Sequence, residues 1–147
     1  MKQFAVIGLG NFGYYLATHL YSKGNDVLAI DKNPARVQEI KDHVSRAVVT
    51  DATDMKALES LGIKEMDAVA MCVGTVLSNS ILIALNLNDI GVKRLLAMSI
   101  SEAHGRILKK INRGAEVFFP EKIWHFLWQN VCITRICWII CPSVMII

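Results

Sequence analysis

The sequence predicts an α/β fold of the Rossmann type: a doubly wound, parallel sheet of six strands with helices on both faces. From residue 1 to about 120, short β-rich apolar runs alternate with amphipathic helical stretches. The first run, Phe4 to Ile7, opens directly onto Gly8-Leu9-Gly10-Asn11-Phe12-Gly13. The second run ends on Asp31. Strand, glycine turn, helix, strand and acid, in that order, are typical of a dinucleotide site.

Six short apolar segments have the composition of buried strands, and helical or turn residues separate them. The expected strands are Phe4 to Ile7, Val27 to Ile30, Ala47 to Val49, Ala68 to Cys72, Leu95 to Met98 and Val117 to Phe119.

The helices between these strands have recognisable start and stop signals. Gly24 is expected to end the first helix, and Gly62 and Gly91 lie where later helices should have their C-caps. Asn33 and Pro34 provide an N-cap and a proline in the first turn of the second helix. Each helix is therefore bounded independently of its apolar pattern.

The first helix carries an apolar stripe that we expect to pack on the sheet. The stripe consists of Phe12, Leu16 and Leu20, joined by Tyr15 and His19. We expect His19 to be a packed or half-exposed helix residue, because the sequence places no carboxylate or nucleophile beside it.

Length and composition restrict the function classes. A chain of 147 residues has room for one domain with a core, and too little for a dinucleotide fold plus a separate substrate domain. The net charge of +3, without a block of like charges, gives no reason to expect a nucleic-acid partner. The start, Met1-Lys2-Gln3, does not resemble a secretory leader, so we expect a cytoplasmic protein. The four cysteines form no Cys-x-x-Cys pair, and we expect neither a metal site nor a disulfide framework.

The glycine turn is expected to bind phosphate through its backbone. Gly8 should make the tight exit from the first strand, Gly10 should let a pyrophosphate approach, and Gly13 should let the helix pack close to the strand. The N–H groups near Asn11 and Phe12 begin a helix, where free donors and the helix dipole favour an anion.

Asp31 is expected to bind the ribose of the same ligand. It lies eighteen residues after Gly13, at the carboxyl end of the second strand, where a carboxylate can accept hydrogen bonds from both ribose hydroxyls. Its charge would repel a 2′-phosphate, which disfavours NADP. The alternative is that the glycines only form a tight corner and that Asp31 caps the helix starting at Asn33.

Two further loops reach the same edge of the sheet. Asp51 follows the third strand, where a ligand contact and ordinary turn chemistry both remain open, and Thr53 is predicted to be the N-cap of the next helix. After the fourth strand, Gly74 and Thr75 are placed over the nicotinamide or the second phosphate, or form only a turn. Ser78 or Asn79 is expected to begin the following helix.

With these residues in place, the chain resembles the KTN (RCK N-terminal, TrkA-N) domains. These are nucleotide-binding regulatory subunits of Ktr/Trk potassium uptake systems and of ligand-gated potassium channels. The resemblance covers residues 1 to about 122. It is carried by Phe4 to Gly13, Val27 to Asp31, Asp51-Ala52-Thr53-Asp54, Leu58 to Gly62 with Ile63, and Phe119-Pro120-Glu121-Lys122.

The resemblance implies a domain that binds NAD(H) or ATP/ADP, forms dimers that assemble into an octameric ring, and docks under a membrane potassium-translocating subunit at the inner face of the membrane. It implies phosphate contacts from the glycines, a ribose contact from Asp31, and adenosine contacts from Asp51 and Thr53. Glu121 matches a glutamate that helps to place a cation beside a terminal phosphate; its other possible role is ordinary surface charge. The remaining expected contacts are Asn11, Phe12, Lys32, Ala52, Gly74, Thr75 and Asn79.

Two departures from the family pattern concern phosphate charge. Many members carry Arg directly after the second glycine, whereas this chain has the neutral Asn11. The fifth strand often ends in a basic residue, whereas here Met98 is followed by Ser99. The first departure weakens the case for ATP selectivity, and the second removes another possible phosphate or interface cation.

Residues 123–147 do not continue the pattern of the domain formed by residues 1–122. They contain no Asp or Glu and a single Arg. When the tail is back-translated and each codon is read from its third base, residues 127 to 141 can encode Leu-Ala-Glu-Arg-Leu-His-Asn-Pro-Asp-Met-Leu-Asp-Tyr-Leu, which has the family's helix and Leu-Asp-Tyr loop. We therefore hypothesise a frameshift near Lys122 or Ile123. A membrane anchor, interrupted by Arg135, and an apolar oligomerisation segment are the alternatives.

These observations favour a non-enzymatic sensor that binds NAD(H) or an adenine nucleotide and regulates potassium transport. The alternative is an NAD-dependent oxidoreductase fragment that lacks its substrate domain. The sequence offers neither a Tyr-x-x-x-Lys nor a His-Asp/Glu arrangement after the fourth strand for such chemistry. A third possibility is an interaction module with a vestigial site.

Overall fold

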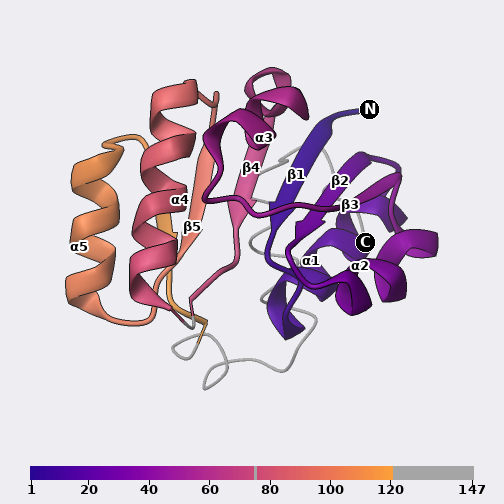
Figure 1. The fold of residues 1–147 in the computed structure, drawn as a ribbon, viewed down its shortest axis with the longest axis horizontal. Coiled ribbons are helices and arrows are strands. Elements are labelled where there is room, and N and C mark those ends of the chain that lie inside the picture. Colours follow the sequence, from indigo (N-terminus) through magenta and orange to yellow (C-terminus); the bar gives the residue numbers. More distant parts are fainter. Residues whose placement is uncertain (75, 121–147) are drawn as a thin grey trace.

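The computed structural model describes residues 1–74 and 76–120. It confirms the predicted sheet, in which six parallel strands follow the order β3-β2-β1-β4-β5-β6 (Figure 1). The strands are β1 (Gln3–Ile7), β2 (Asp26–Asp31), β3 (Arg46–Val49), β4 (Ala68–Met71), β5 (Leu95–Met98) and β6 (Glu116–Phe118). Their bounds differ from the predicted ones by at most one residue at either end.

Five α-helices and two 3₁₀ turns connect the strands within the described residues. The helices are α1 (Asn11–Ser22), α2 (Pro34–Ile40), α3 (Met55–Ser60), α4 (Leu77–Ile90) and α5 (Glu102–Ile111), and the turns are η1 (Lys41–His43) and η2 (Ile63–Glu65). Not one of these helices is both long and apolar enough to cross a bilayer.

Most of the predicted helix boundaries are confirmed. The side chain of Asn33 accepts the N–H of Ala35 at 2.9 Å, and Pro34 is the first residue of α2. Gly24, Gly62 and Gly91 all have positive φ angles just after helices, a conformation that glycine adopts without strain.

The predicted stripe on α1 is only partly correct. Leu16 and Leu20 are buried and Phe12 packs beside them, but Tyr15 is 47% exposed. Tyr15 stands one position before Leu16, and a step of about 100° turns it away from the sheet. His19 is half-buried, as expected.

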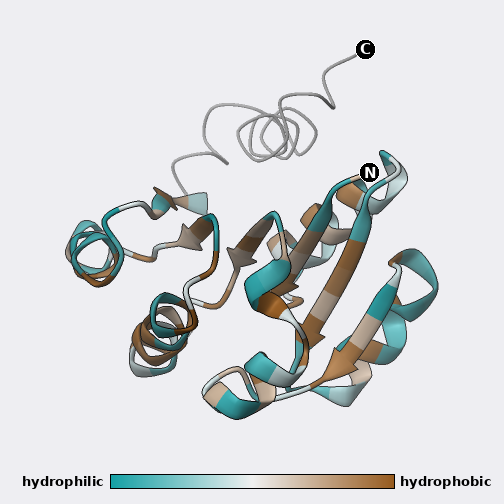
Figure 2. Ribbon diagram, turned by 90° about the horizontal axis from the view of Figure 1, so that it is seen from above, coloured by the Kyte–Doolittle hydropathy of each residue, from teal (hydrophilic) through white to brown (hydrophobic). Residues whose placement is uncertain are grey.

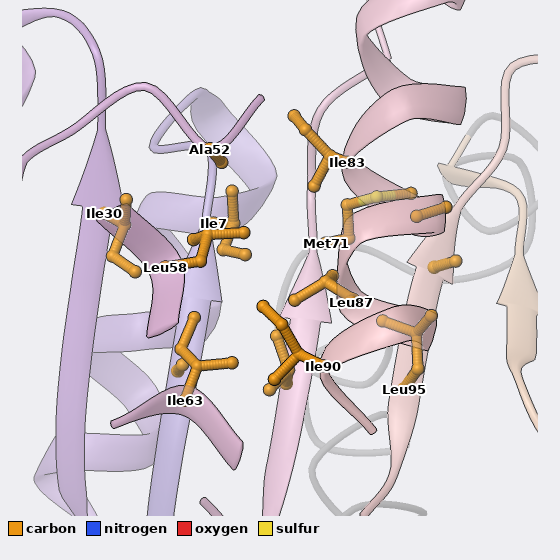
Figure 3. Close-up of a cluster of buried hydrophobic side chains, with 14 of the residues drawn as sticks. Ile7, Ile30, Ala52, Leu58, Ile63, Met71, Ile83, Leu87, Ile90 and Leu95 are labelled. Atoms are coloured by element: carbon orange, nitrogen blue, oxygen red, sulfur yellow. The ribbon is translucent and has the colours of Figure 1, made fainter. Parts of the chain in front are cut away.

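Each face of the sheet is covered by its own hydrophobic cluster. Helices α1 and α2 pack on one face, through Leu16, Leu20 and Ile40. Helices α3, α4 and α5 cover the other, where Leu87 and neighbouring side chains meet the strands (Figure 3). The strands between the helix layers are mostly hydrophobic, whereas the helices combine hydrophobic and hydrophilic residues (Figure 2). Within the described residues, both faces of the sheet are thus covered by helices.

The strand order places a topological switch between β1 and β4. From β1 the chain proceeds outward to β2 and β3, and it then returns to place β4 on the other side of β1. In open parallel sheets of this kind, ligands bind beyond the carboxyl ends of the strands at the switch point.

Candidate functional site

A cleft of about 310 Å³ lies at the carboxyl ends of the strands, at this switch point. Every predicted site residue in the described part of the chain lines it: Gly8, Gly10, Asn11, Phe12, Gly13, Asp31, Lys32, Asp51, Ala52, Thr53, Gly74 and Asn79. Thr75, Glu121 and the tail lie outside the described residues. The structure therefore brings five separate segments of the chain to one cleft, from the β3 side to the β5 side.

The three glycines of the turn differ in what their bare backbones allow. Gly8 has φ +92°, and a Cβ added there would lie 2.7 Å from the carbonyl oxygen of Cys72. A Cβ on Gly13 would lie 1.8 Å from the carbonyl oxygen of Gly8. No atom lies within 4 Å of a Cβ added at Gly10, which faces open space. The fold itself needs Gly8 and Gly13, whereas Gly10 leaves room beside the cleft.

Helix α1 begins at this turn with its amide groups available. Gly10 is the N-cap, no side chain caps the helix, and the first turn contains no acidic residue. The first N–H groups of an α-helix lack intrahelical partners, and together with the helix dipole they favour an anion. Because Asn11, Phe12 and Gly13 line the cleft, the start of the helix faces the cleft with N–H groups of the kind that favour an anion.

Asp31 connects the glycine turn to the second helix. One carboxylate oxygen accepts the N–H of Leu9 at 2.8 Å, and the other accepts the N–H of Asn33 at 2.8 Å. The guanidinium of Arg36 lies 3.6 Å from the first oxygen. The alternative prediction was that Asp31 supports the start of the helix at Asn33. The bond to the N–H of Asn33 gives it that role, although the N-cap residue itself is Asn33. A carboxylate has about four lone-pair sites, so these two bonds leave capacity for a ribose.

The β3–α3 loop is preorganised by its own side chains. Asp51 accepts the N–H of Thr53 at 3.0 Å and its hydroxyl at 2.7 Å. These bonds from Thr53, the backbone bond above all, lower the pKa of Asp51, and the charge of Lys32 lowers it further. Asp51 is therefore ionised at neutral pH.

The prediction that Thr53 caps α3 is wrong. The N-cap is Asp54, whose carboxylate accepts the N–H groups of Lys56 at 3.1 Å and Ala57 at 3.3 Å. Both residues can cap a helix, but the hydroxyl of Thr53 is taken by Asp51. Because two adjacent residues can each cap the helix, the sequence does not decide between them. The hydrogen bond from Thr53 to Asp51 in the preceding turn decides it.

A buried asparagine that the sequence analysis did not single out holds the same loop in place. The amide of Asn86, in α4, donates to the carbonyl oxygens of Thr53 at 2.9 Å and Ala52 at 3.3 Å. The signal was a polar residue at helical spacing from the buried Ile83 and Ile90 of α4.

The β4–β5 half of the cleft has a more apolar lining. Val73, Val76, Ile83 and Met98 contribute to it beside Asn79. Helix α4 begins at Leu77, so the predicted starts at Ser78 or Asn79 are wrong. The N-cap residue is Val76, whose side chain makes no capping hydrogen bond. Without a capping side chain, the sequence gives no marker for this boundary.

Positive charge in the described lining is confined to the β2 side. Lys32 and Arg36 are the only lysine or arginine residues there, and Asp31 and Asp51 are the only acids. Arg36 was not predicted, although its place three residues after the N-cap Asn33 puts it in the first helical turn after Asp31. Among the residues that the structure describes, no cluster of His, Cys, Asp and Glu could hold a metal ion.

Comparison with known proteins agrees with this geometry. Residues 4–120 match the model of the TrkA-N domain. Ktr system potassium uptake protein A of Vibrio alginolyticus is 37% identical, and protein C of Bacillus subtilis (strain 168) is 36% identical, each over 122 residues. Either alignment covers 82% of this chain and 54% of the relative, so the chain spans about half the length of these relatives.

Solved structures share the fold. The NAD(P)-binding domain of an exopolyphosphatase-related protein from Archaeoglobus fulgidus aligns with a TM-score of 0.74 and 22% identity, over 92% of this chain and 98% of that one. The GsuK channel bound to NAD aligns with a TM-score of 0.67 and 15% identity, over 79% of this chain and 21% of the channel.

Proposed function

The chain belongs to the TrkA-N domain family, and from this premise we propose that it binds NAD(H) or ATP/ADP and thereby regulates potassium uptake. One observation carries the proposal: the open backbone at Gly10 and the carboxylate of Asp31 face a single cleft. A phosphate at the start of α1 and a ribose near Asp31 fit the two ends of one adenosine-type ligand.

The charges in the cleft favour the dinucleotide over the triphosphate. The described cations, Lys32 and Arg36, lie on the β2 side, and the phosphate turn carries the neutral Asn11. A pyrophosphate flanked by two nucleosides requires less compensating charge than a terminal triphosphate. The apolar lining from Val76 and Met98 suits a planar ring better than a phosphate chain.

The partner is proposed from the relatives, which are potassium uptake proteins. Because this chain spans about half of their length, the activity of the whole system is an inference. We propose that the chain acts in the cytoplasm, bound at the inner face of the membrane to a potassium-translocating subunit. We also propose dimers that assemble into an octameric ring. Exposed leucines on α4, Leu82 and Leu85, are compatible with self-association.

We propose a sensor and not an enzyme. In this proposal, residues 1–122 form the nucleotide-binding domain, and ligand exchange changes the contacts of that domain with its partner. Binding energy then shifts a conformational equilibrium, which requires that the ligand favour one state over the other.

Equilibrium titration of the full chain with NADH, ADP, ATP and NADP tests the proposal. NADH is expected to bind more tightly than ATP, because the phosphate turn lacks a cation, and more tightly than NADP, because Asp31 faces the ribose. As a control for glycine substitutions in the cleft, Gly114→Ala is expected to bind as the wild type does, since Gly114 is exposed and absent from the cleft lining. If none of the four nucleotides binds, the proposed function is wrong.

A further inference from the structure

A buried histidine lies between α4 and α5, beside the cleft but not in its lining. His104 is 1% exposed, and Ser80 is completely buried. Nε2 of His104 lies 2.9 Å from Oγ of Ser80, and Nδ1 accepts the N–H of Ile100 at 3.2 Å. A ring nitrogen that accepts a hydrogen bond carries no proton. Neutral His104 therefore has its proton on Nε2, and this N–H donates a hydrogen bond to Oγ of Ser80. One imidazole therefore joins α4 to the turn between β5 and α5.

That turn is a stiff unit. Oγ of Ser99 donates to the carbonyl oxygen of Ser101 at 2.6 Å, and Oγ of Ser101 caps α5 by accepting the N–H of His104 at 3.1 Å. The N–H of Ser99 donates to the carbonyl oxygen of Phe118 at 2.8 Å. Within the part of the chain that the structure describes, the hydrogen bond between His104 and Ser80 connects this turn to α4.

Both segments joined by His104 reach the β4–β5 half of the cleft. Ser80 directly follows Asn79, and Met98 lies two residues before Ile100; Asn79 and Met98 line the cleft. The Cγ2 of Ile100 lies 2.9 Å from the point that a Cβ on Gly74 would occupy, so the two loops are in close contact. Helices α4 and α5 stand side by side (Figure 1). A shift of the β5–α5 turn would therefore move the wall of the cleft.

We propose that His104 is a positioning residue for ligand binding. Its neutral imidazole holds the β5–α5 turn against the start of α4 and keeps the β4–β5 half of the cleft in its binding shape. The identity of the ligand rests on the proposed function, whereas the connection between the two segments rests on the hydrogen bonds of His104 and Ser80.

The test compares two probes in the full chain. NADH reaches both halves of the cleft, whereas AMP needs only the adenosine half near Asp31. In His104→Ala, the Kd for NADH is expected to rise roughly 2- to 30-fold, the range typical of residues that couple to a site without touching the ligand. The Kd for AMP is expected to stay unchanged. Equal weakening of both probes, or no change in either, would overturn the proposal.

His104→Asn separates the two bonds of the imidazole. Its side-chain oxygen can stand near the position of Nδ1 and accept the N–H of Ile100, although the side chain is too short to reach Ser80. Because the connection to α4 is then lost, we expect NADH affinity as low as in His104→Ala. Ser80→Ala likewise cuts only the connection to α4, and it replaces His104→Ala if that variant does not fold. Wild-type NADH affinity in His104→Asn would contradict the role assigned to the bond with Ser80.

Hydrogen exchange of the ligand-free chain gives a measurement that does not depend on the ligand. In His104→Ala, the amides of Ser80 and of residues 99–101 are expected to exchange faster, while those of residues 31–36 keep their protection. Unchanged exchange in both segments would overturn the proposal. If the wild-type chain binds neither probe, the proposed function fails, and the exchange comparison still decides whether His104 holds the two segments together.

Discussion

Replacing Gly10 by alanine separates the requirements of the ligand from those of the fold. Gly10 has φ −68° and ψ −170°, which an alanine adopts without strain, and no atom lies within 4 Å of the added Cβ. The loss of a glycine makes the unfolded chain less flexible, which stabilises the fold by about 0.4–1 kcal/mol. Alanine is a poorer N-cap than glycine by a similar amount, roughly 0.5–1 kcal/mol. The two effects nearly cancel, so we expect the free energy of unfolding to stay unchanged.

Ligand binding, in contrast, should weaken strongly. The methyl group projects into the space through which a phosphate approaches the N–H groups of Asn11 and Phe12. Losing one hydrogen bond to a charged group costs about 1.5–3 kcal/mol, which corresponds to a roughly 10- to 150-fold increase in Kd. Isothermal titration with NADH and urea denaturation of the same preparation measure both quantities.

Gly13→Ala is the matched comparison. Its Cβ would lie 1.8 Å from the carbonyl oxygen of Gly8, a backbone atom that cannot rotate away. We expect a loss of stability well above the roughly 1–3 kcal/mol typical of overpacking. If Gly10→Ala instead destabilises the fold while leaving NADH affinity intact, the assignment of the open space at Gly10 to a phosphate is wrong.

Three further outcomes are expected. Asp31→Asn should cost about 1–3 kcal/mol in urea denaturation, because an amide oxygen cannot replace both acceptor atoms that serve Leu9 and Asn33; unchanged stability would contradict this. Burial lowers the pKa of His104 below its usual value of 6.5, so the unfolded chain binds a proton at this residue more readily than the folded chain. The contribution of His104 to the free energy of unfolding should therefore be fully present above about pH 6.5 and should decline below it. In His104→Asn this decline should become smaller, while His19, whose pKa is lowered by burial and by Lys23, still contributes a decline of the same sign. Sequencing of the gene should show a one-base step near the codons for residues 122 and 123; an uninterrupted frame in independent reads would refute the frameshift.

The sheet and the glycine turn could be predicted because each follows from local rules. An apolar run such as Val27 to Ile30 has to be buried on both faces, and this requirement alone identifies a central parallel strand. The positive φ of Gly8 and the close approach at Gly13 likewise tolerate no side chain. Because such constraints restrict the residue type at each position, they can be recognised from the sequence.

The errors occurred where neighbouring residues compete for the same role. Thr53 and Asp54 can both cap a helix, and the outcome depends on Asp51, which takes the hydroxyl of Thr53. The start of α4 at Leu77 has no capping side chain to reveal it. The contributions of Arg36 and Asn86 to the site depend on tertiary placement, because their partners lie in other elements.

Asp31 shows why the ligand-binding and structural interpretations of one residue need not exclude each other. Its two oxygens hold Leu9 of the glycine turn and Asn33 at the start of α2. These bonds fix the glycine turn and the start of α2 relative to one another, and with them the proposed phosphate and ribose ends of the cleft. A ligand that binds to a preformed cleft loses less free energy to ordering the protein. The structural role of Asp31, which holds the glycine turn and the N-cap residue Asn33, is therefore part of what would make it effective against a ribose. Substitution should weaken nucleotide binding by more than the loss of a single hydrogen bond.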